Sequence, residues 1–398
     1  MFKNVALFFL VMGFTISAVT ACNKTADTIP PVAESNTETM QSKPTEASKV
    51  LKIGCEAPLT GGSAEQGNRT VMGAMLAVEE INAAGGINGY MLELVPEDDE
   101  AQPQKAATIA NKFVANNDIV AVVGYTQSSC ALAAAPIYNQ GGLVQVCTFS
   151  SNMGIAEAGP YTFRTCVTDA LNVDLNLGIL LNDKDIRKLG MLYENNDFGV
   201  GFATLSAEYL KNLGMEFLVT EQMILGETKD FSTIITKFKN AGVEGICVAG
   251  DETELCLFAK QCHQLDYFPA ITSPGTYNPN VIELGGTDVE GLTGNTLFDP
   301  NNLSDELAEY FARLFARFPE TNGKTDLHST TGYTAVKVVA EAIKNGGTTR
   351  DEIMRYMTTM HDFPSFFGPI TFDENGDATL ILSKIVIKDG KFENYRGE

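Results

Sequence analysis

Two serines stand where the sequence could bind an anion. Ser128 and Ser129 follow the apolar run at residues 119–123, at the start of a predicted helix. Backbone N–H groups and the helix dipole at such a start favour an anion such as an α-carboxylate, and the two hydroxyls add hydrogen-bond donors. A serine at this position can also simply cap the helix. We therefore expect one serine to face a ligand and the other to cap the helix.

A pair of acidic residues offers the opposite charge. Asp251 and Glu252 follow the apolar run at residues 246–249 and could receive an ammonium group. The alternative is a solvated acidic loop. A free amino acid is a zwitterion, so it needs anion-binding and cation-binding groups close together. The serines and these carboxylates would supply both.

The composition argues against several other functions. The 398 residues include 28 Lys and Arg against 50 Asp and Glu, and the formal charge of −22 disfavours nucleic acid, whose phosphates need clustered cations. Three histidines leave little for imidazole catalysis. The sequence has no Walker loop, no Cys–His motif and no zinc-type cysteine spacing. We predict that the chain is not an enzyme and holds no metal or cofactor. The pairing of the seven cysteines other than Cys22 stays open.

The N-terminus has the pattern of an export signal. Lys3 precedes an apolar run at residues 5–18, which is too short to span a bilayer, although an uncleaved anchor is the alternative. The run VTAC at residues 19–22 resembles a bacterial lipobox and implies lipidation of Cys22. Residues 23–48 cannot bury enough apolar surface to fold and predict a flexible tether. We expect a signal peptide at 1–21, a lipidated Cys22 with a tether to residue 49, and a domain in the periplasm or on the outer face of the membrane.

The body of the chain predicts an α/β fold. Strand-like apolar runs alternate with helical patterns, the strands at 51–55, 92–95, 119–123, 143–147, 189–193, 217–220, 246–249 and 270–272. This alternation predicts two doubly wound parallel-sheet lobes. Helices at 303–315 and 329–344 follow, and a capping box at Thr349 opens another. We expect 370–372 and 380–387 to form a terminal hairpin. Ligand capture is expected in a cleft at the carboxyl ends of the strands.

Eight short motifs resemble one family, in order and at family spacing. They are IGCEAPLTG at 53–61, AAGGING at 83–89, VVG at 122–124, FRT at 163–165, DFG at 197–199, KDFS at 229–232, GYTAV at 332–336 and GPITF at 368–372. The chain from about 51 to 387 resembles the leucine/isoleucine/valine-type periplasmic binding proteins, the substrate-binding components of branched-chain amino acid ABC transporters. The resemblance implies the type I periplasmic-binding fold.

The resemblance also implies how the chain is divided into lobes and which ligand and partner proteins it binds. Three hinge crossings near residues 165, 298 and 366 would divide it into lobe one, 51–165 plus 299–365, and lobe two, 166–298 plus 366–398. The lobes would close on an amino acid or an amino-acid-like molecule. The partners would be an ABC permease and its ATPase subunits.

Further ligand contacts follow from the resemblance. In the family, the turn at 148–151 contacts the ligand carboxylate and amine. Ser151 stands at a threonine position of this turn, Ser150 at a backbone contact, and Phe149 in place of a small residue. Phe149 would therefore narrow the pocket or move the contact.

Three more positions complete the predicted site. Phe198 stands where the family has an aromatic, usually tyrosine, that could cover the ligand. Gln66 stands where branched-chain binders frequently have an aromatic. Tyr277 belongs to the segment 274–277, near which family members often place a glutamate that this sequence lacks. These departures make a more polar ligand plausible.

Alternative functions stay open at this point. The same fold could serve a ligand-sensing receptor that feeds a signalling partner rather than a transporter. The ligand could also be a neutral amide or urea.

Overall fold

The computed structural model describes residues 49–397 of the chain. The expected signal peptide, the lipidated Cys22 and nearly all of the expected tether lie outside the described residues. Lys49, which we assigned to the tether, is the first residue of strand β1. Within residues 49–397, no helix is both long and apolar enough to cross a membrane.

Five strands form the first sheet, in the order β2-β1-β3-β4-β5, and all their pairings are parallel. Their bounds are Lys49–Ala57 (β1), Tyr90–Asp98 (β2), Ile119–Gly124 (β3), Val144–Cys147 (β4) and Thr162–Arg164 (β5). Every residue of β3 is buried, as expected of a parallel strand covered on both faces. The connections run through α1 (Ala64–Ala83), α2 (Pro103–Ala115), α3 (Ser128–Gln140) and the short helix η1 (Met153–Ala158).

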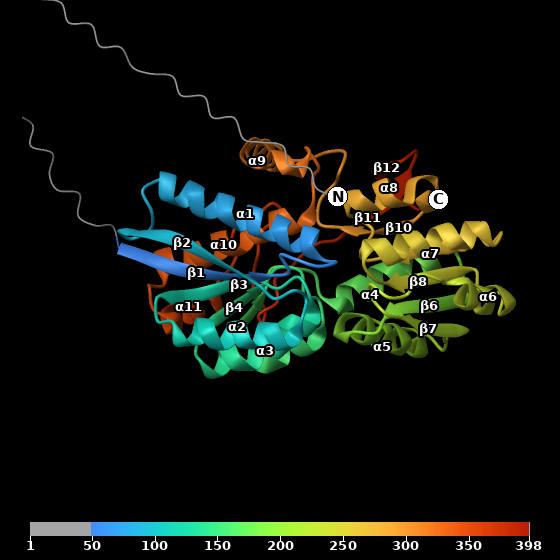
Figure 1. Cartoon of the computed structure of the whole chain (residues 1–398), viewed down its shortest axis with the longest axis horizontal. Helices are drawn as coiled ribbons and strands as arrows, with labels where there is room; N and C mark the ends of the chain where they lie inside the picture. Colours follow the sequence, from blue (N-terminus) through green and yellow to red (C-terminus); the bar gives the residue numbers. More distant parts are fainter. Residues whose placement is uncertain (1–48, 398) are drawn as a thin grey trace, which may run out of the picture. The chain divides into compact units, whose positions relative to one another are not determined.

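Helices cover both faces of this sheet, with α1 on one side and α2 and α3 on the other (Figure 1). Helix α10 (Leu327–Asn345) lies along α1. The two helices approach closely because each has a glycine at the contact. A Cβ on Gly73 would lie 1.9 Å from the carbonyl oxygen of Ser329, and a Cβ on Gly332 would lie 2.3 Å from that of Thr70. This crossing fixes where α10 begins.

The second sheet has seven strands in the order β12-β11-β10-β9-β8-β6-β7. Its strands are β6 (Leu189–Glu194), β7 (Val219–Met223), β8 (Gly245–Ala249), β9 (Ala270–Ser273), β10 (Thr293–Thr296), β11 (Ser383–Lys388) and β12 (Lys391–Asn394). The pairings of β11 with β10 and with β12 are antiparallel, and the others are parallel. Its helical segments are α4 (Asp169–Gly178), η2 (Ile179–Asp183), α5 (Asp197–Asn212), α6 (Ser232–Asn240), α7 (Glu252–Gln264), α8 (Pro279–Gly285) and η3 (Gly286–Val289). Alternate residues of β8 belong to different hydrophobic clusters, so this sheet is also covered on both faces.

The segment between β10 and β11 returns to the first sheet. It contains α9 (Asp305–Arg317), η4 (Pro319–Thr321), α10 and α11 (Arg350–Met357), of which α10 and α11 contact β3. The predicted capping box of α11 is confirmed, because the Thr349 side chain accepts from the Glu352 N–H and the Glu352 side chain accepts from the Thr349 N–H. The chain therefore passes between the sheets after β5, after β10 and before β11.

The predicted terminal hairpin of 370–372 with 380–387 is confirmed only at its turn, where Phe372 pairs antiparallel with Ala378 and the N–H of Asp373 donates to the carbonyl of Asp377. Ile370 and Phe372 form only isolated bridges, and the hairpin joins β11 to β12. The segment between them is tied elsewhere: Arg164 donates its backbone N–H to the carbonyl of Gly376 and accepts from the N–H of Ala378. Those bonds attach the turn to the edge of the first sheet at β5.

Candidate ligand-binding site

A cavity enclosing about 890 Å³, counting open solvent at its mouth, lies where strands of both sheets end. Its lining includes residues that follow β3 and β4 in the first sheet and β8 and β9 in the second. Loops at the carboxyl ends of parallel strands are the usual place for ligands in α/β folds.

The structure brings most of the predicted residues to this cavity. The predicted residues that line it are Gln66, Ser128, Phe149, Ser151, Phe198, Asp251, Glu252 and Tyr277. Ser129 and Ser150 do not. The Ser129 Oγ accepts from the N–H of Asp197 over 3.2 Å, and the Ser150 Oγ donates to the carbonyl of Tyr125 over 2.7 Å. Their hydroxyls are used within the protein, so we drop them as side-chain ligands.

The start of α3 forms one wall of the cavity. The expectation that a serine caps this helix is wrong: Gln127 is the N-cap residue, Ser128 is the first helical residue, and no side chain caps the first turn. The backbone turns sharply before it, with Gly124 at φ 120° and Tyr125 at φ 62°. The Tyr125 hydroxyl is anchored on the buried carboxyl of Glu56. The N–H groups of the first turn thus meet the cavity without competition from a cap, which suits an anion.

Buried Arg164 holds the neighbouring turn. It pairs with Asp377, and the Nη2–Oδ2 distance is 2.7 Å. Its Nη1 donates to the carbonyl oxygens of Ser151 at 3.1 Å and Asn152 at 2.7 Å. Ser151 is therefore positioned by an ion pair that nothing in the sequence signals.

Carboxyl groups form the opposite wall. Asp251 precedes α7, and its backbone N–H donates to Oε1 of buried Glu194 over 2.6 Å. Burial, with a contribution from Glu252, raises the pKa of Asp251 to about 7. Burial and the nearby Asp251 raise the pKa of Glu194 well above its ordinary value. Asp251 and Glu252 are only partly exposed and belong to the cavity wall, so this is not a solvated loop. A bound cation would relieve the repulsion among these groups.

Hydrogen bonds join the two walls. Gln66 Nε2 donates to Glu252 Oε2 over 2.9 Å, and Ser63 Oγ donates to Asp251 Oδ2 over 3.3 Å. Farther along the cleft, Asn152 Nδ2 donates to the carbonyl of Asp197 over 2.6 Å. The structure therefore has the two sides of the cleft in direct contact.

His328 is a cavity residue that the sequence reasoning missed. It lies in the first turn of α10, and its ring stacks on Phe149 with centroids 4.1 Å apart. Asp326, a good N-cap residue, signals a helix start in the sequence. Nothing in the sequence signals that this helix start reaches the cleft. The described lining residues include no Lys or Arg.

The cysteine pairing left open by the sequence is answered for the described residues. All seven cysteines in residues 49–397 are free and buried. Burial raises the pKa of the Cys55 thiol to about 12, so it is an unreactive core group.

Comparison with known proteins gives one family. A family model described as periplasmic binding protein matches residues 50–382. A curated relative from Pseudomonas aeruginosa, the leucine-, isoleucine-, valine-, threonine-, and alanine-binding protein, is 29% identical over 335 residues, which cover 83% of this chain and 88% of the relative. The Leu/Ile/Val-binding protein homolog 2 of Brucella abortus is 29% identical over 357 residues, or 87% of this chain and 93% of the relative.

Solved structures show the same fold. The branched-chain amino acid transporter substrate binding protein LivJ from Streptococcus pneumoniae, in complex with isoleucine, matches with a TM-score of 0.79 at 23% identity, covering 87% of this chain and 99% of the other. A periplasmic binding protein type 1 from Bordetella pertussis matches with a TM-score of 0.79 at 19% identity, covering 87% and 100%. The predicted fold class is therefore confirmed.

Proposed function

This chain belongs to the periplasmic binding protein family, and we propose that it is the extracytoplasmic solute-binding component of an ABC uptake system that captures an amino acid or an amino-acid-like molecule. The proposal rests on one observation: the cavity has hydrogen-bond donors on one wall and carboxyl groups on the other. An uncapped helix start and a pair of carboxyl residues line opposite sides of the same cavity.

The two walls suit the two ends of a zwitterion. The first turn of α3, with Ser128 and Ser151, receives the α-carboxylate through neutral hydrogen-bond donors and the helix dipole. Asp251, supported by Glu252, receives the ammonium group. Phe198 supplies an apolar cover. Names of relatives such as the Pseudomonas protein support an amino acid as the ligand class.

The two walls bind opposite ends of the ligand, so the lobes close when the ligand binds. Each wall meets half of the ligand, so tight binding requires both. The three passages of the chain between the sheets are the proposed hinges. The resemblance puts the lobes at 51–165 plus 299–365 and at 166–298 plus 366–398, but Gly376 and Ala378 bond to Arg164 of β5, so we propose that the third hinge lies after Ala378, just before β11. The closed form would be presented to a permease with ATPase subunits, and the chain itself would catalyse no reaction.

Anchoring to the membrane is a separate proposal. The lipobox-like run that ends at Cys22 supports export followed by lipidation of that cysteine. The polar segment up to residue 48 would then link the anchor to the folded part.

A thermal-shift screen tests the ligand class. The purified protein is heated with each free amino acid, with simple amides, with urea and with short peptides. A ligand at 100 times its Kd adds about 2.7 kcal/mol of stability, which is a measurable shift. Stabilisation by one or a few amino acids is expected. Stabilisation by urea or amides alone would replace the amino acid with a neutral solute.

A further inference from the structure

One buried polar group in the cavity wall has no partner. His328 lines the cavity and is 6% exposed, and its Nε2 has no hydrogen-bond partner within residues 49–397. Leaving such a group unpaired is unfavourable. Its ring is held against Phe149, at 4.1 Å between centroids and 29° between planes. The ring is therefore held at the cavity wall, where a bound molecule can contact it.

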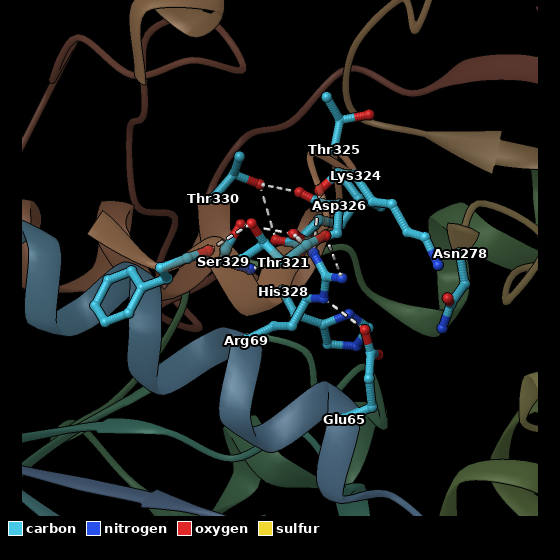
Figure 2. Close-up of polar contacts among 12 residues, drawn as sticks. Glu65, Arg69, Asn278, Thr321, Lys324, Thr325, Asp326, His328, Ser329 and Thr330 are labelled. Atoms are coloured by element: carbon cyan, nitrogen blue, oxygen red, sulfur yellow. Dashed lines mark hydrogen bonds and ion pairs between the residues drawn. The ribbon is translucent and has the colours of Figure 1, made fainter. Parts of the chain in front are cut away.

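A rigid network keeps the ring in that place. Asp326 accepts from the N–H of Ser329 over 2.7 Å and from its hydroxyl over 2.8 Å, which caps α10. Arg69 of α1 donates from Nη1 to Asp326 Oδ2 over 3.0 Å and to the carbonyl of Lys324 over 3.0 Å. Figure 2 shows these groups gathered around the start of α10, with the His328 ring beside Arg69. The close crossing of α1 and α10 leaves this helix start little freedom to move.

The imidazole is neutral at physiological pH. Burial lowers the pKa of His328 to about 4; the nearby Asp326 opposes the effect and Arg69 adds to it. A neutral imidazole offers one N–H donor and one acceptor, and no charge to attract a second carboxylate. The described residues of the lining include carboxyl groups and no Lys or Arg, so a dicarboxylate is disfavoured as well.

We propose that His328 makes the cavity selective for amino acids whose side chain carries a neutral hydrogen-bonding group, a hydroxyl or a carboxamide, over aliphatic amino acids of the same shape. The inference rests on the proposed amino-acid function and narrows it. Asn278, Asn295 and Thr331 add neutral polar groups to the same lining. A site built to bond a polar group rejects an analogue that lacks it much more strongly than an apolar pocket rejects a small change in size.

Isosteric ligand pairs test the inference. Calorimetry on the purified protein compares threonine with valine and asparagine with leucine. The polar member of at least one pair should bind at least tenfold more tightly. His328→Leu should bring that ratio close to one, whereas His328→Gln, which keeps a donor and an acceptor, should keep most of it. His361→Leu, at an exposed position, is the matched control and should keep the wild-type ratio.

The possible outcomes distinguish a failure of the role of His328 from a failure of the proposed function. Wild-type protein that binds valine and leucine as tightly as their polar partners overturns the selectivity and leaves amino-acid binding intact. Wild-type protein that binds no amino acid overturns the proposed function together with this inference. A wild-type ratio in folded His328→Leu assigns the selectivity to other residues and overturns the role of His328. If that variant fails to unfold cooperatively, the ratios of the wild type and of His328→Gln still decide.

Discussion

Gln66 of α1 donates a hydrogen bond from Nε2 to Oε2 of Glu252, the first residue of α7, over 2.9 Å. Helix α1 packs on the first sheet and α7 on the second, so this bond exists only while the two sides of the cleft are together.

Loss of this bond should weaken ligand binding without unfolding the protein. Gln66→Ala removes one net hydrogen bond of the closed form, about 0.5–1.5 kcal/mol, and should raise Kd about two- to tenfold. Calorimetry measures the change. Gln140→Ala, at an exposed position of α3, is the control and should leave Kd unchanged. Equal affinity of the two variants would show that closure does not depend on this contact.

Replacing a charge-recognising side chain in either cavity wall should weaken ligand binding more than Gln66→Ala does. Asp251→Asn removes the proposed partner of the ligand ammonium, and Ser128→Ala removes a hydroxyl beside the proposed carboxylate site. Each should raise Kd at least about tenfold, or ~1.4 kcal/mol. Glu216→Gln, an exposed acidic position far along the chain from both walls, serves as the charge-matched control. Wild-type affinity in Asp251→Asn would remove the ammonium assignment and favour a neutral ligand.

Binding should strengthen as the pH rises towards 7. The carboxyl of Asp251 faces Glu252, Glu194 and Glu254, and burial raises its pKa to about 7. The ammonium group binds the ionised carboxylate, so protonation of the empty site competes with the ligand below that pH. Affinity should fall by up to about tenfold for each pH unit below 7 and level off above it. Calorimetry from pH 5.5 to 8 measures the profile.

The Asp251→Asn variant is the control for this profile. Its residual affinity should change much less over the same range, because the titrating group is gone. A wild-type slope in the variant would assign the pH dependence to another group, such as Asp169, whose pKa burial raises to about 6.

The buried pair of Arg164 and Asp377 should matter for stability more than any surface pair. Asp377→Ala leaves the fully buried Arg164 unpaired, which costs about 3–5 kcal/mol in free energy of unfolding. Urea denaturation measures the loss. The exposed pair of Lys188 with Glu244 gives the matched control, and Glu244→Ala should cost less than about 1 kcal/mol. Similar losses in the two variants would show that Arg164 finds other acceptors.

Replacement of Cys22 should abolish lipidation and leave ligand binding intact. The lipobox-like run makes Cys22 the proposed acylation site. Radioactive palmitate should label the wild-type chain and not Cys22→Ser. Labelling of the variant at the wild-type level would contradict the anchor.

The sequence was sufficient to predict those helices and strands whose own residues determine their secondary structure. Strand β3 reads IVAVVG and is recognisable from its apolar run alone. Strand β10 reads TGNT, and we missed it because a short polar segment becomes a strand only by pairing with β9 and β11. The segment 370–372 is apolar but forms no strand, since Ile370 exchanges both of its backbone hydrogen bonds with Phe363.

The site residues fall into the same two groups: those that their own segment predicts and those that depend on packing between distant segments. Ser128 and Asp251 could be proposed because each follows an apolar strand, and such positions meet at the carboxyl edge of a parallel sheet. His328 follows no strand. It reaches the cavity only because α10 crosses α1 at two glycines, a packing relationship between residues more than 250 positions apart in the chain. Its pairing with Phe149 could not be read from either segment alone.

Recognition of both charged ends of an amino acid is the central claim, and calorimetry with isosteric analogues tests it most directly. The amino acid that binds most tightly is compared with its 2-hydroxy acid, which replaces the ammonium with a hydroxyl, and with its carboxamide, which replaces the carboxylate. Each analogue should bind at least about tenfold more weakly, ~1.4 kcal/mol, because each removes one charged contact. A 2-hydroxy acid or a carboxamide that binds as tightly as the parent amino acid would contradict the claim.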